Sequence, residues 1–298
     1  MSKKILFFGN HNVGYNCLEF LLASNYEVVC VVVNKGHKCR CTWYNSVWKL
    51  ASKNKLLIFE SDEIEKKRNV NRIKKLNPDL LLSVSYNYKI PKDMLKIPRY
   101  GAYNLHGSYL PDYKGRFSPV WCILNGEKYT GVTLHEISEK IDSGRIVARK
   151  KIKIYSDSTA IEIFNEQVGV SVDLLRENIN KLLSKRTDYL NIDNSKGTYY
   201  TARSNEENRI RWNRTSTEID RLVRAAYFPP YNFAYTYLKG KKIEIKKIFV
   251  KRDINYQRCK PGTIITTIEE CPLVATGDGC CLILDSTLKR FNQGDIFK

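Results

Sequence analysis

The chain has few of the residues that build metal centres and disulfide frameworks. It contains four histidines in 298 residues, and its nine cysteines are an odd number. The close pairs Cys39/Cys41 and Cys280/Cys281 lack the Cys-x-x-Cys spacing of a zinc site. We therefore expect reduced thiols, a cytoplasmic location and no metal.

Long apolar stretches are also missing. No run of 18 apolar residues occurs, so we expect no membrane span. The apolar run from Ile5 to Phe8 is too short for the core of a signal peptide and is followed at once by Gly9-Asn10. It indicates a buried first strand. A hydrophobic fraction of 43% is enough for packed cores.

Acidic residues are scarce relative to basic ones. The chain has 50 Lys and Arg against 31 Asp and Glu, a formal net charge of +19. Such a charge is compatible with nucleic-acid binding. The lysines, however, are spread over the whole chain without an arginine-rich block, which favours solvated surfaces. A ligand that carries phosphate would still be attracted.

The usual glycine-rich phosphate loops are absent too. Gly9 to Gly14 follows the first predicted strand, as a dinucleotide fingerprint would, but His11 occupies the position of the middle glycine. The segment also lacks the Gly-Lys-Ser/Thr of a P-loop. We therefore reject both nucleotide-binding interpretations of this loop.

The order of the predicted elements indicates an α/β fold in two domains. Apolar strand runs alternate with amphipathic helices in the first half: strands at 5–8, 27–33 and 80–84, and helices at 18–23, 46–53 and 62–76. A capping box at Thr159/Glu162 opens a further long helix. The sequence predicts a doubly wound, Rossmann-like domain in residues 1–190 and a linker in 191–204.

The remaining residues, 205–298, predict a small β-barrel domain. A helix at 216–226 precedes five strand-like runs separated by Gly, Pro and Asp turns. These runs cover 233–238, 242–250, 262–267, 273–276 and 280–284.

Three polar residues form the most informative pattern of the chain. Asn104 and His106 are two apart, so in a strand they share one face, and Asp142 follows 36 residues after His106. An amide donor, an imidazole base and a carboxylate that orients it are the groups needed to move an acyl group onto an amine.

The stretch from Asn104 to Val147 resembles the active-site segment of the folate-dependent formyltransferases. That family shares an Asn-x-His pair, a Ser-x-Leu-Pro-x-Tyr-x-Gly loop, a Gly-Val-Thr-x-His strand and an Asp-x-Gly turn. All four are present in this order, at Asn104/His106, Ser108–Gly115, Gly131–His135 and Asp142–Gly144. Weaker similarity covers nearly the whole chain. The amino-acid sequence at 106–108 and 116–119 is most similar to that of enzymes that formylate nucleotide-linked 4-amino sugars.

The residue chemistry and the resemblance together give each site residue an expected role. Asn104 is expected to stabilise the developing oxyanion and His106 to accept the proton of the amine, and the resemblance implies that Asp142 lies beside the histidine and orients its ring. His135 ends an apolar strand, and we interpret its role as structural support. The donor, N10-formyltetrahydrofolate, is expected at the strand end and turn formed by Ser85, Tyr86, Tyr88, Ile141 and Asp142. The acceptor is expected at Asn10, His11, Lys89, Lys114, Arg116 and Tyr231, where the cations suit a diphosphate.

The function expected from the resemblance is formyl transfer to the amine of a UDP- or dTDP-linked 4-amino-4,6-dideoxyhexose. A methionyl-tRNA formyltransferase is the first alternative, supported by the charge, although the loop from Asn34 to Trp43 is short for the basic insertion that tRNA binding requires. Glycinamide ribonucleotide transformylase is disfavoured because it lacks a second domain of this kind. A non-catalytic nucleic-acid-binding protein is the alternative of another class. The formation of a homodimer stays open.

Overall fold

The computed structural model describes residues 2–36, 44–184, 187–230, 233–251 and 259–298. The chain divides into two compact units. The first consists of Met1–Ser118, Tyr129–Lys153 and Phe164–Tyr200, and the second of Pro119–Lys128, Ile154–Ile163 and Thr201–Lys298. The first unit ends at Tyr200, within the predicted linker of residues 191–204. The predicted domain boundary near residue 190 therefore stays a prediction.

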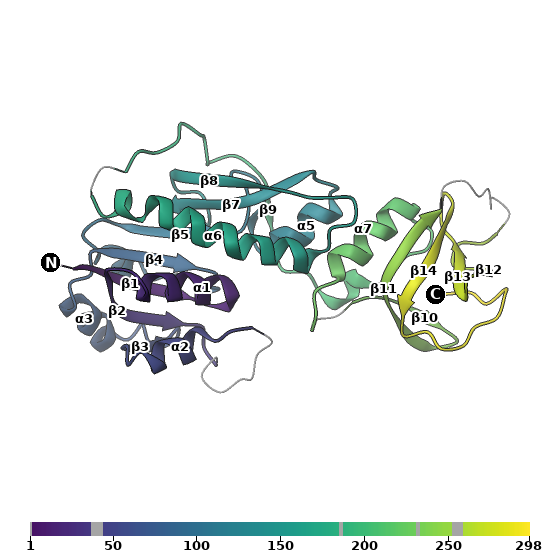
Figure 1. The fold of residues 1–298 in the computed structure, drawn as a ribbon, viewed down its shortest axis with the longest axis horizontal. Coiled ribbons are helices and arrows are strands. Elements are labelled where there is room, and N and C mark those ends of the chain that lie inside the picture. The colour runs from purple at the N-terminus through teal and green to yellow at the C-terminus, as the bar shows by residue number, and fades with distance from the viewer. Residues whose placement is uncertain (1, 37–43, 185–186, 231–232, 252–258) are drawn as a thin grey trace. The chain divides into compact units, whose positions relative to one another are not determined.

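The first unit is built on a seven-stranded sheet with the order β3-β2-β1-β4-β5-β7-β8 (Figure 1). The first five of these strands pair in parallel, and β7 and β8 are antiparallel additions at one edge. The strands are β1 (Lys3–Gly9), β2 (Tyr26–Val33), β3 (Ile58–Glu60), β4 (Leu80–Val84), β5 (Ala102–His106), β7 (Tyr129–Glu136) and β8 (Ile146–Lys153). This topology confirms the predicted doubly wound, mixed α/β architecture.

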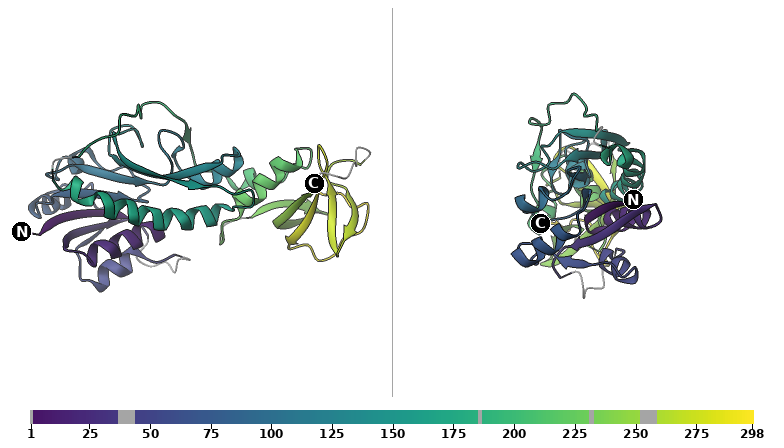
Figure 2. Two further views of the ribbon diagram at one scale, coloured as in Figure 1. Left: turned by 45° about the horizontal axis from the view of Figure 1, so that its top comes forward. Right: turned by 90° about the vertical axis from the view of Figure 1, so that its left-hand side faces the viewer.

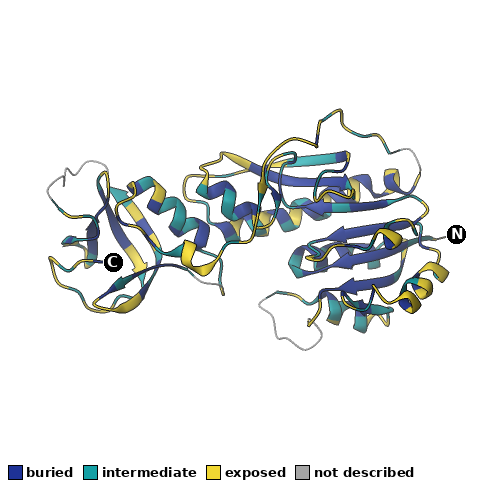
Figure 3. Cartoon of the chain, turned by 180° about the vertical axis from the view of Figure 1, so that it is seen from behind, coloured by how far each residue is buried: buried dark blue, intermediate teal, exposed yellow. Residues whose placement is uncertain are grey.

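Helices cover both faces of this sheet because its central strands are apolar on both sides. One face packs against α1 (His11–Leu22), α2 (Val47–Lys53) and the long α6 (Ala160–Leu182). The other packs against α3 (Lys67–Lys75) and α4 (Lys92–Leu95). Figure 2 shows the sheet from two further directions, with α6 running along it, and Figure 3 shows its central strands buried.

Sequence signals explain where these helices begin. Glu162 accepts a hydrogen bond from the Thr159 amide at 2.8 Å, as the predicted capping box requires. The α3 helix begins five residues later than predicted, because residues 61–65 form turns. Several short elements were not predicted, among them β3, α4 and α5 (Ser118–Leu124). No helix among the described residues is long and apolar enough to cross a membrane.

The second unit contains a five-stranded antiparallel sheet with the order β10-β11-β14-β13-β12. Its strands are β10 (Ala234–Leu238), β11 (Lys241–Lys251), β12 (Ile264–Ile268), β13 (Cys271–Ala275) and β14 (Cys280–Ser286), and α7 (Ser216–Ala226) packs against it. The five strands lie close to their predicted positions. The described strands do not pair β10 with β12, so they form an open sheet rather than the predicted closed barrel.

Candidate active site

The site lies at the point where the strand order of the sheet reverses, between β1 and β4. β1 and β4 are neighbours, but the chain leaves β1 toward β2 and leaves β4 toward β5, so their carboxyl ends frame the crevice in which open α/β sheets bind ligands. The Asn10 amide donates to the Val84 carbonyl at 3.2 Å and ties the two strand ends together.

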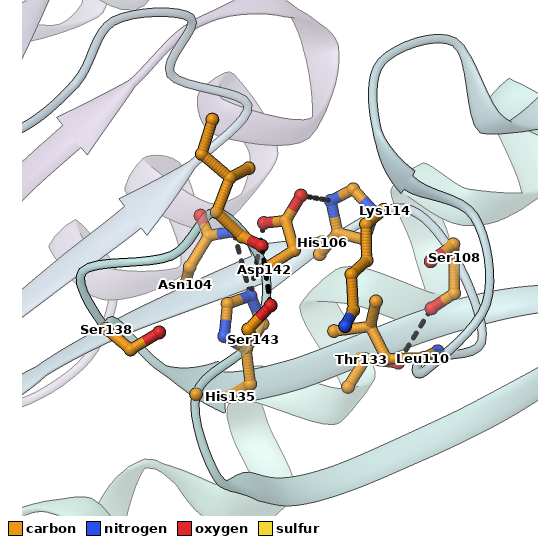
Figure 4. A network of polar contacts seen from close by, with 12 residues as sticks. Asn104, His106, Ser108, Leu110, Lys114, Thr133, His135, Ser138, Asp142 and Ser143 are labelled. Atoms are coloured by element: carbon orange, nitrogen blue, oxygen red, sulfur yellow. Dashed lines mark hydrogen bonds and ion pairs between the residues drawn. The ribbon is translucent and has the colours of Figure 1, made fainter. Parts of the chain in front are cut away.

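Strand pairing brings the polar side chains of this site together. Asn104 and His106 occupy β5, and the register places Asn104 opposite His135 of β7. Asp142 lies in the turn that joins β7 to β8, with a φ of +50°. Figure 4 shows the four side chains turned toward one another. The sequence therefore predicted a set of residues that the structure does bring together.

His106 has an acceptor oxygen beside each ring nitrogen. Its Nε2 lies 2.9 Å from the Tyr113 carbonyl oxygen, which can only accept, so Nε2 carries a hydrogen. Its Nδ1 lies 3.5 Å from Oδ2 of Asp142, and both side chains are 10% exposed. This arrangement stabilises the ring once it has taken up a second proton.

His135 connects Asn104 to Asp142. Its Nδ1 donates to its neighbouring carbonyl, Glu136 O, at 2.8 Å, so the neutral ring accepts at Nε2 from Asn104 Nδ2 at 3.2 Å. The same Nε2 lies 3.5 Å from Oδ1 of Asp142, to which a protonated ring would donate. The supporting role predicted for His135 is compatible with these contacts, because the ring contacts both Asn104 and Asp142.

Asp142 is held in its ionised form. Burial alone would raise its pKa, but the facing His106 and His135 rings in their protonated forms, together with the Gly115 amide, hold the pKa of Asp142 well below its ordinary value. The Gly115 amide donates to Oδ2 at 2.9 Å. An anion at this position can orient the facing imidazole and stabilise the imidazolium formed during proton transfer.

The loop after His106 is fixed by side chains from other elements. Thr133 of β7, fully buried, donates to the Ser108 carbonyl at 2.7 Å and accepts from the Leu110 amide at 3.0 Å (Figure 4). Gln167 of α6 donates to the Gly107 carbonyl at 2.6 Å. These contacts fix the loop in the position in which the Tyr113 carbonyl reaches His106. Apart from the Gly-Val-Thr-x-His wording that includes Thr133, no sequence signal marked them.

The residues predicted to bind the donor differ in their surroundings. Ser85 follows β4 with a φ of +53°, and the apolar side chains of Tyr88 and Ile141 are 49% and 59% exposed. Tyr86 packs edge-on against Phe8, with ring centroids 5.1 Å apart, and burial raises its pKa. Its ring therefore belongs to the core. Exposed apolar surface and a sharply turned backbone fit a flat ring system bound by main-chain groups.

The residues predicted to bind the acceptor are less uniform. Asn10 is 3% exposed, and its side-chain nitrogen has no hydrogen-bond partner among the described residues. His11 adopts a φ of +58°, the backbone conformation that a glycine would take there, and its ring lies 4.2 Å from that of Tyr44. Lys89 is exposed, and the exposed Arg116 donates to the Asn87 carbonyl at 3.0 Å.

Lys114 has a structural role that the sequence did not indicate. It is 5% exposed, and its ammonium donates to the carbonyls of Asn194 at 2.6 Å and Lys196 at 2.7 Å. Burial lowers its pKa. We therefore assign it to the support of the site rather than to a diphosphate. Tyr231 lies outside the described residues, as does most of the predicted loop from Asn34 to Trp43.

The described residues contain no group of three His, Cys, Asp or Glu side chains arranged to hold a metal ion. The chemistry available here is acid–base and electrostatic: a base backed by a carboxylate, and an amide donor held beside it. This is the set required for attack of an amine on a carbonyl carbon.

Comparison with known proteins agrees with this chemistry. The profile of the formyl transferase family matches residues 3–177, and that of the formyl transferase C-terminal domain matches residues 203–295. The chain is 32% identical over 264 residues to the bifunctional polymyxin resistance protein ArnA of Wigglesworthia glossinidia brevipalpis, covering 88% of this chain and 40% of that longer protein. It is 30% identical to the methionyl-tRNA formyltransferase of Acetivibrio thermocellus, covering 94% of this chain and 90% of the relative.

Solved structures are similar over nearly the full length. WlaRD, a sugar 3N-formyl transferase crystallised in the presence of dTDP and 5-N-formyltetrahydrofolate, superposes with a TM-score of 0.74 at 25% identity, covering 97% of this chain and all of the other. An N-formyltransferase from Helicobacter canadensis has a TM-score of 0.73 at 24% identity, covering 95% of this chain and 98% of the other, which shows a shared fold.

Proposed function

Because the chain belongs to the formyl transferase family, we propose that it transfers a formyl group from N10-formyltetrahydrofolate to the amine of a nucleotide-linked amino sugar. The convergence of Asn104, His106 and Asp142 at the end of β5 carries this proposal. The bound donor supplies an activated one-carbon group at the formyl level of oxidation. All other steps follow from the residues of the chain.

His106 acts as the base. Its Nε2 hydrogen is committed to the Tyr113 carbonyl, so the lone pair of the neutral ring is on Nδ1, which faces Asp142. The amine nitrogen forms a bond to the formyl carbon while its proton is taken up at Nδ1, and the ionised Asp142 stabilises the resulting imidazolium. The imidazolium returns this proton to N10 as the bond between the formyl carbon and N10 breaks and tetrahydrofolate leaves.

Asn104 stabilises the oxygen on which negative charge develops. One hydrogen of its amide nitrogen is donated to His135, which holds the group in place and leaves the second hydrogen for the reacting oxygen. A donor fixed in this way is worth about 3–4 kcal/mol in the transition state.

The acceptor is proposed to be a UDP- or dTDP-linked 4-amino-4,6-dideoxyhexose. The amino-acid sequence of the Asn104–Val147 segment supports a 4-amino sugar, and the similarity to WlaRD supports a nucleotide sugar in general. Since WlaRD is named a 3N-formyl transferase, the amine position is the variable to test. The proposed acceptor contacts are the exposed Lys89 and Arg116 together with Asn10, whose side-chain nitrogen has no partner in the described part of the chain.

The test is mass spectrometry of amino-sugar nucleotides incubated with enzyme and N10-formyltetrahydrofolate. We expect the mass of one added formyl group on a 4-amino sugar nucleotide, faster than on its 3-amino isomer, and none with His106→Asn. Preference for the 3-amino isomer would change only the proposed position of the amine on the sugar. Efficient formylation of methionyl-tRNA without turnover of any sugar nucleotide would replace the proposal with the first alternative, which the relative from Acetivibrio thermocellus supports.

We infer two further properties with the same proposal, and the oligomeric state is open to measurement. We infer that the second unit is an OB-like domain and that its open five-stranded sheet forms part of the barrel of that domain. The described cysteines are all free, which fits a reducing, cytoplasmic compartment. A homodimer would be detected by light scattering of the purified protein.

A further inference from the structure

A segment that reads as a linker is fastened to the active site. Residues 193–200, here called the strap, end in β9 (Tyr199–Tyr200), which pairs in parallel with β6 (Lys114–Gly115). The Lys114 amide donates to the Thr198 carbonyl at 2.9 Å, and the Tyr113 amide donates to the Thr198 hydroxyl at 3.0 Å. The strap thus contacts Tyr113, whose carbonyl faces His106, and Lys114, which precedes the Gly115 amide that donates to Asp142.

Asn194 joins the strap to the catalytic turn. It is 4% exposed, and its amide nitrogen donates to the Asp142 carbonyl at 3.0 Å and to the Gly144 carbonyl at 2.7 Å. Both side-chain hydrogens are therefore used on the turn that carries Asp142. The Asn194 backbone carbonyl accepts from the buried Lys114 ammonium, which holds the strap itself in place.

The turn depends on this outside support. Asp142 has a left-handed backbone, a conformation that costs an aspartate free energy. Inside the turn, the Ser143 hydroxyl donates to the Ile141 carbonyl at 3.0 Å, while the Ser143 amide makes a long 3.4 Å contact to the Lys140 carbonyl. The Asn194 side chain donates to the carbonyls on either side of Ser143 and so fixes where the Asp142 side chain begins.

We propose that Asn194 is a positioning residue that sets the Asp142 carboxylate against His106, an inference that rests on the role of Asp142 in the proposed function. The carboxylate meets the His106 ring from one side and the Gly115 amide from the other. Without Asn194 the turn is free to relax and the carboxylate moves away from the ring. A displacement of about 1 Å in such a group can reduce turnover about a hundredfold.

The test compares Asn194→Ala and Asn194→Asp with Ser195→Ala in the full-length protein. Asn194→Asp has nearly the same shape but lacks both donor hydrogens. Ser195 is an exposed neighbour in the strap whose hydroxyl donates to Asp193 and not to the catalytic turn, so it is the matched control. We expect kcat to fall about 10- to 100-fold in both Asn194 variants, with KM for donor and acceptor within about threefold of wild type, and no change in Ser195→Ala.

A double-mutant cycle with Asp142→Asn separates positioning from general damage. If Asn194 acts through Asp142, its removal in the Asp142→Asn background lowers kcat by less than about threefold. Wild-type kcat in the Asn194 variants, additive losses in the cycle, or loss of the folded state in both variants would each overturn the proposal while leaving the proposed function intact. Wild-type kcat in Asp142→Asn would overturn both.

Discussion

The imidazole of His106 is enclosed by an acceptor oxygen at each ring nitrogen. The Tyr113 carbonyl holds one ring nitrogen and the Asp142 carboxylate faces the other. A histidine in solution has water at both positions and can turn freely. The enclosure removes this freedom, so the ring receives a proton at one nitrogen and in one direction.

Substitution of the three polar residues tests this arrangement. His106→Asn, Asn104→Ala and Asp142→Asn should each lower kcat about a hundredfold or more, since each removes a group that acts in the transition state. Single-turnover rates with a saturating acceptor measure the effect, and circular dichroism checks the fold. A well-folded His106→Asn with near-normal turnover would contradict the assignment of the base.

The ionised Asp142 also links stability to pH. Its pKa is lowered in the folded protein, so its contribution to stability is complete above the ordinary aspartate value of about 3.9 and is lost as pH falls toward the folded value. We expect the difference in free energy of unfolding between wild type and Asp142→Asn to decrease from pH 5 to pH 3. Guanidinium chloride unfolding at each pH measures it, and a difference that grows on acidification would refute the assignment.

The turn between β7 and β8 has room for only one residue type at Gly144. A Cβ there would lie 1.8 Å from the Glu136 carbonyl oxygen, so any side chain displaces the turn that carries Asp142. Gly144→Ala should therefore lower kcat about a hundredfold and destabilise the fold by about 1–3 kcal/mol. Turnover assays and thermal unfolding measure the two effects.

Gly169 is the matched control for this substitution. It lies in α6 and is exposed, and a Cβ there would meet no atom within 4 Å. Gly169→Ala should leave kcat unchanged and stabilise the protein by up to about 1 kcal/mol, because alanine favours a helix over glycine. Equal losses of activity in the two variants would show that the turn is not special.

Elements with a strong apolar pattern could be predicted from the sequence. The run of β4, Leu80–Val84, is buried throughout, and its predicted bounds coincide with the observed ones. β3 has three residues, too few for a periodic pattern, and was missed. The closure of the second sheet could not be judged either, because turn signals mark where strands end and not which edges pair.

Within the site, sequence patterns indicated which residues meet but not what holds them. Asn104 and His106 share a strand face by simple alternation, and Asp142 was added by resemblance. The strap has the composition of a linker, and one buried asparagine among polar neighbours leaves no pattern. Lys114 resembled a phosphate ligand for the same reason, since its burial depends on the strap that folds over it.

The charge of the whole molecule bears on the choice of acceptor. A net charge of +19 attracts any phosphate-bearing ligand, but steering over long range is screened by salt. Binding of tRNA through many phosphates would fall steeply as salt rises, whereas a compact nucleotide sugar contacts few cations.

We therefore expect the KM for a nucleotide-linked amino sugar to change less than about threefold between 50 and 200 mM salt, and any tRNA binding to be lost over the same range. Steady-state kinetics and filter binding measure the two quantities. Tight tRNA binding at 200 mM salt, together with formylation of methionyl-tRNA, would contradict the expectation.

The strap has a consequence for the protein during its synthesis. Asn194 is 52 residues downstream of Asp142, and the strap pairs with residues some 80 positions before it. A nascent chain that has exposed only the catalytic motif to solvent thus lacks the hydrogen bonds that fix its carboxylate. Since domains form in order as the ribosome extends the chain, we expect the catalytic turn to take its final shape only after residue 200 has left the exit tunnel.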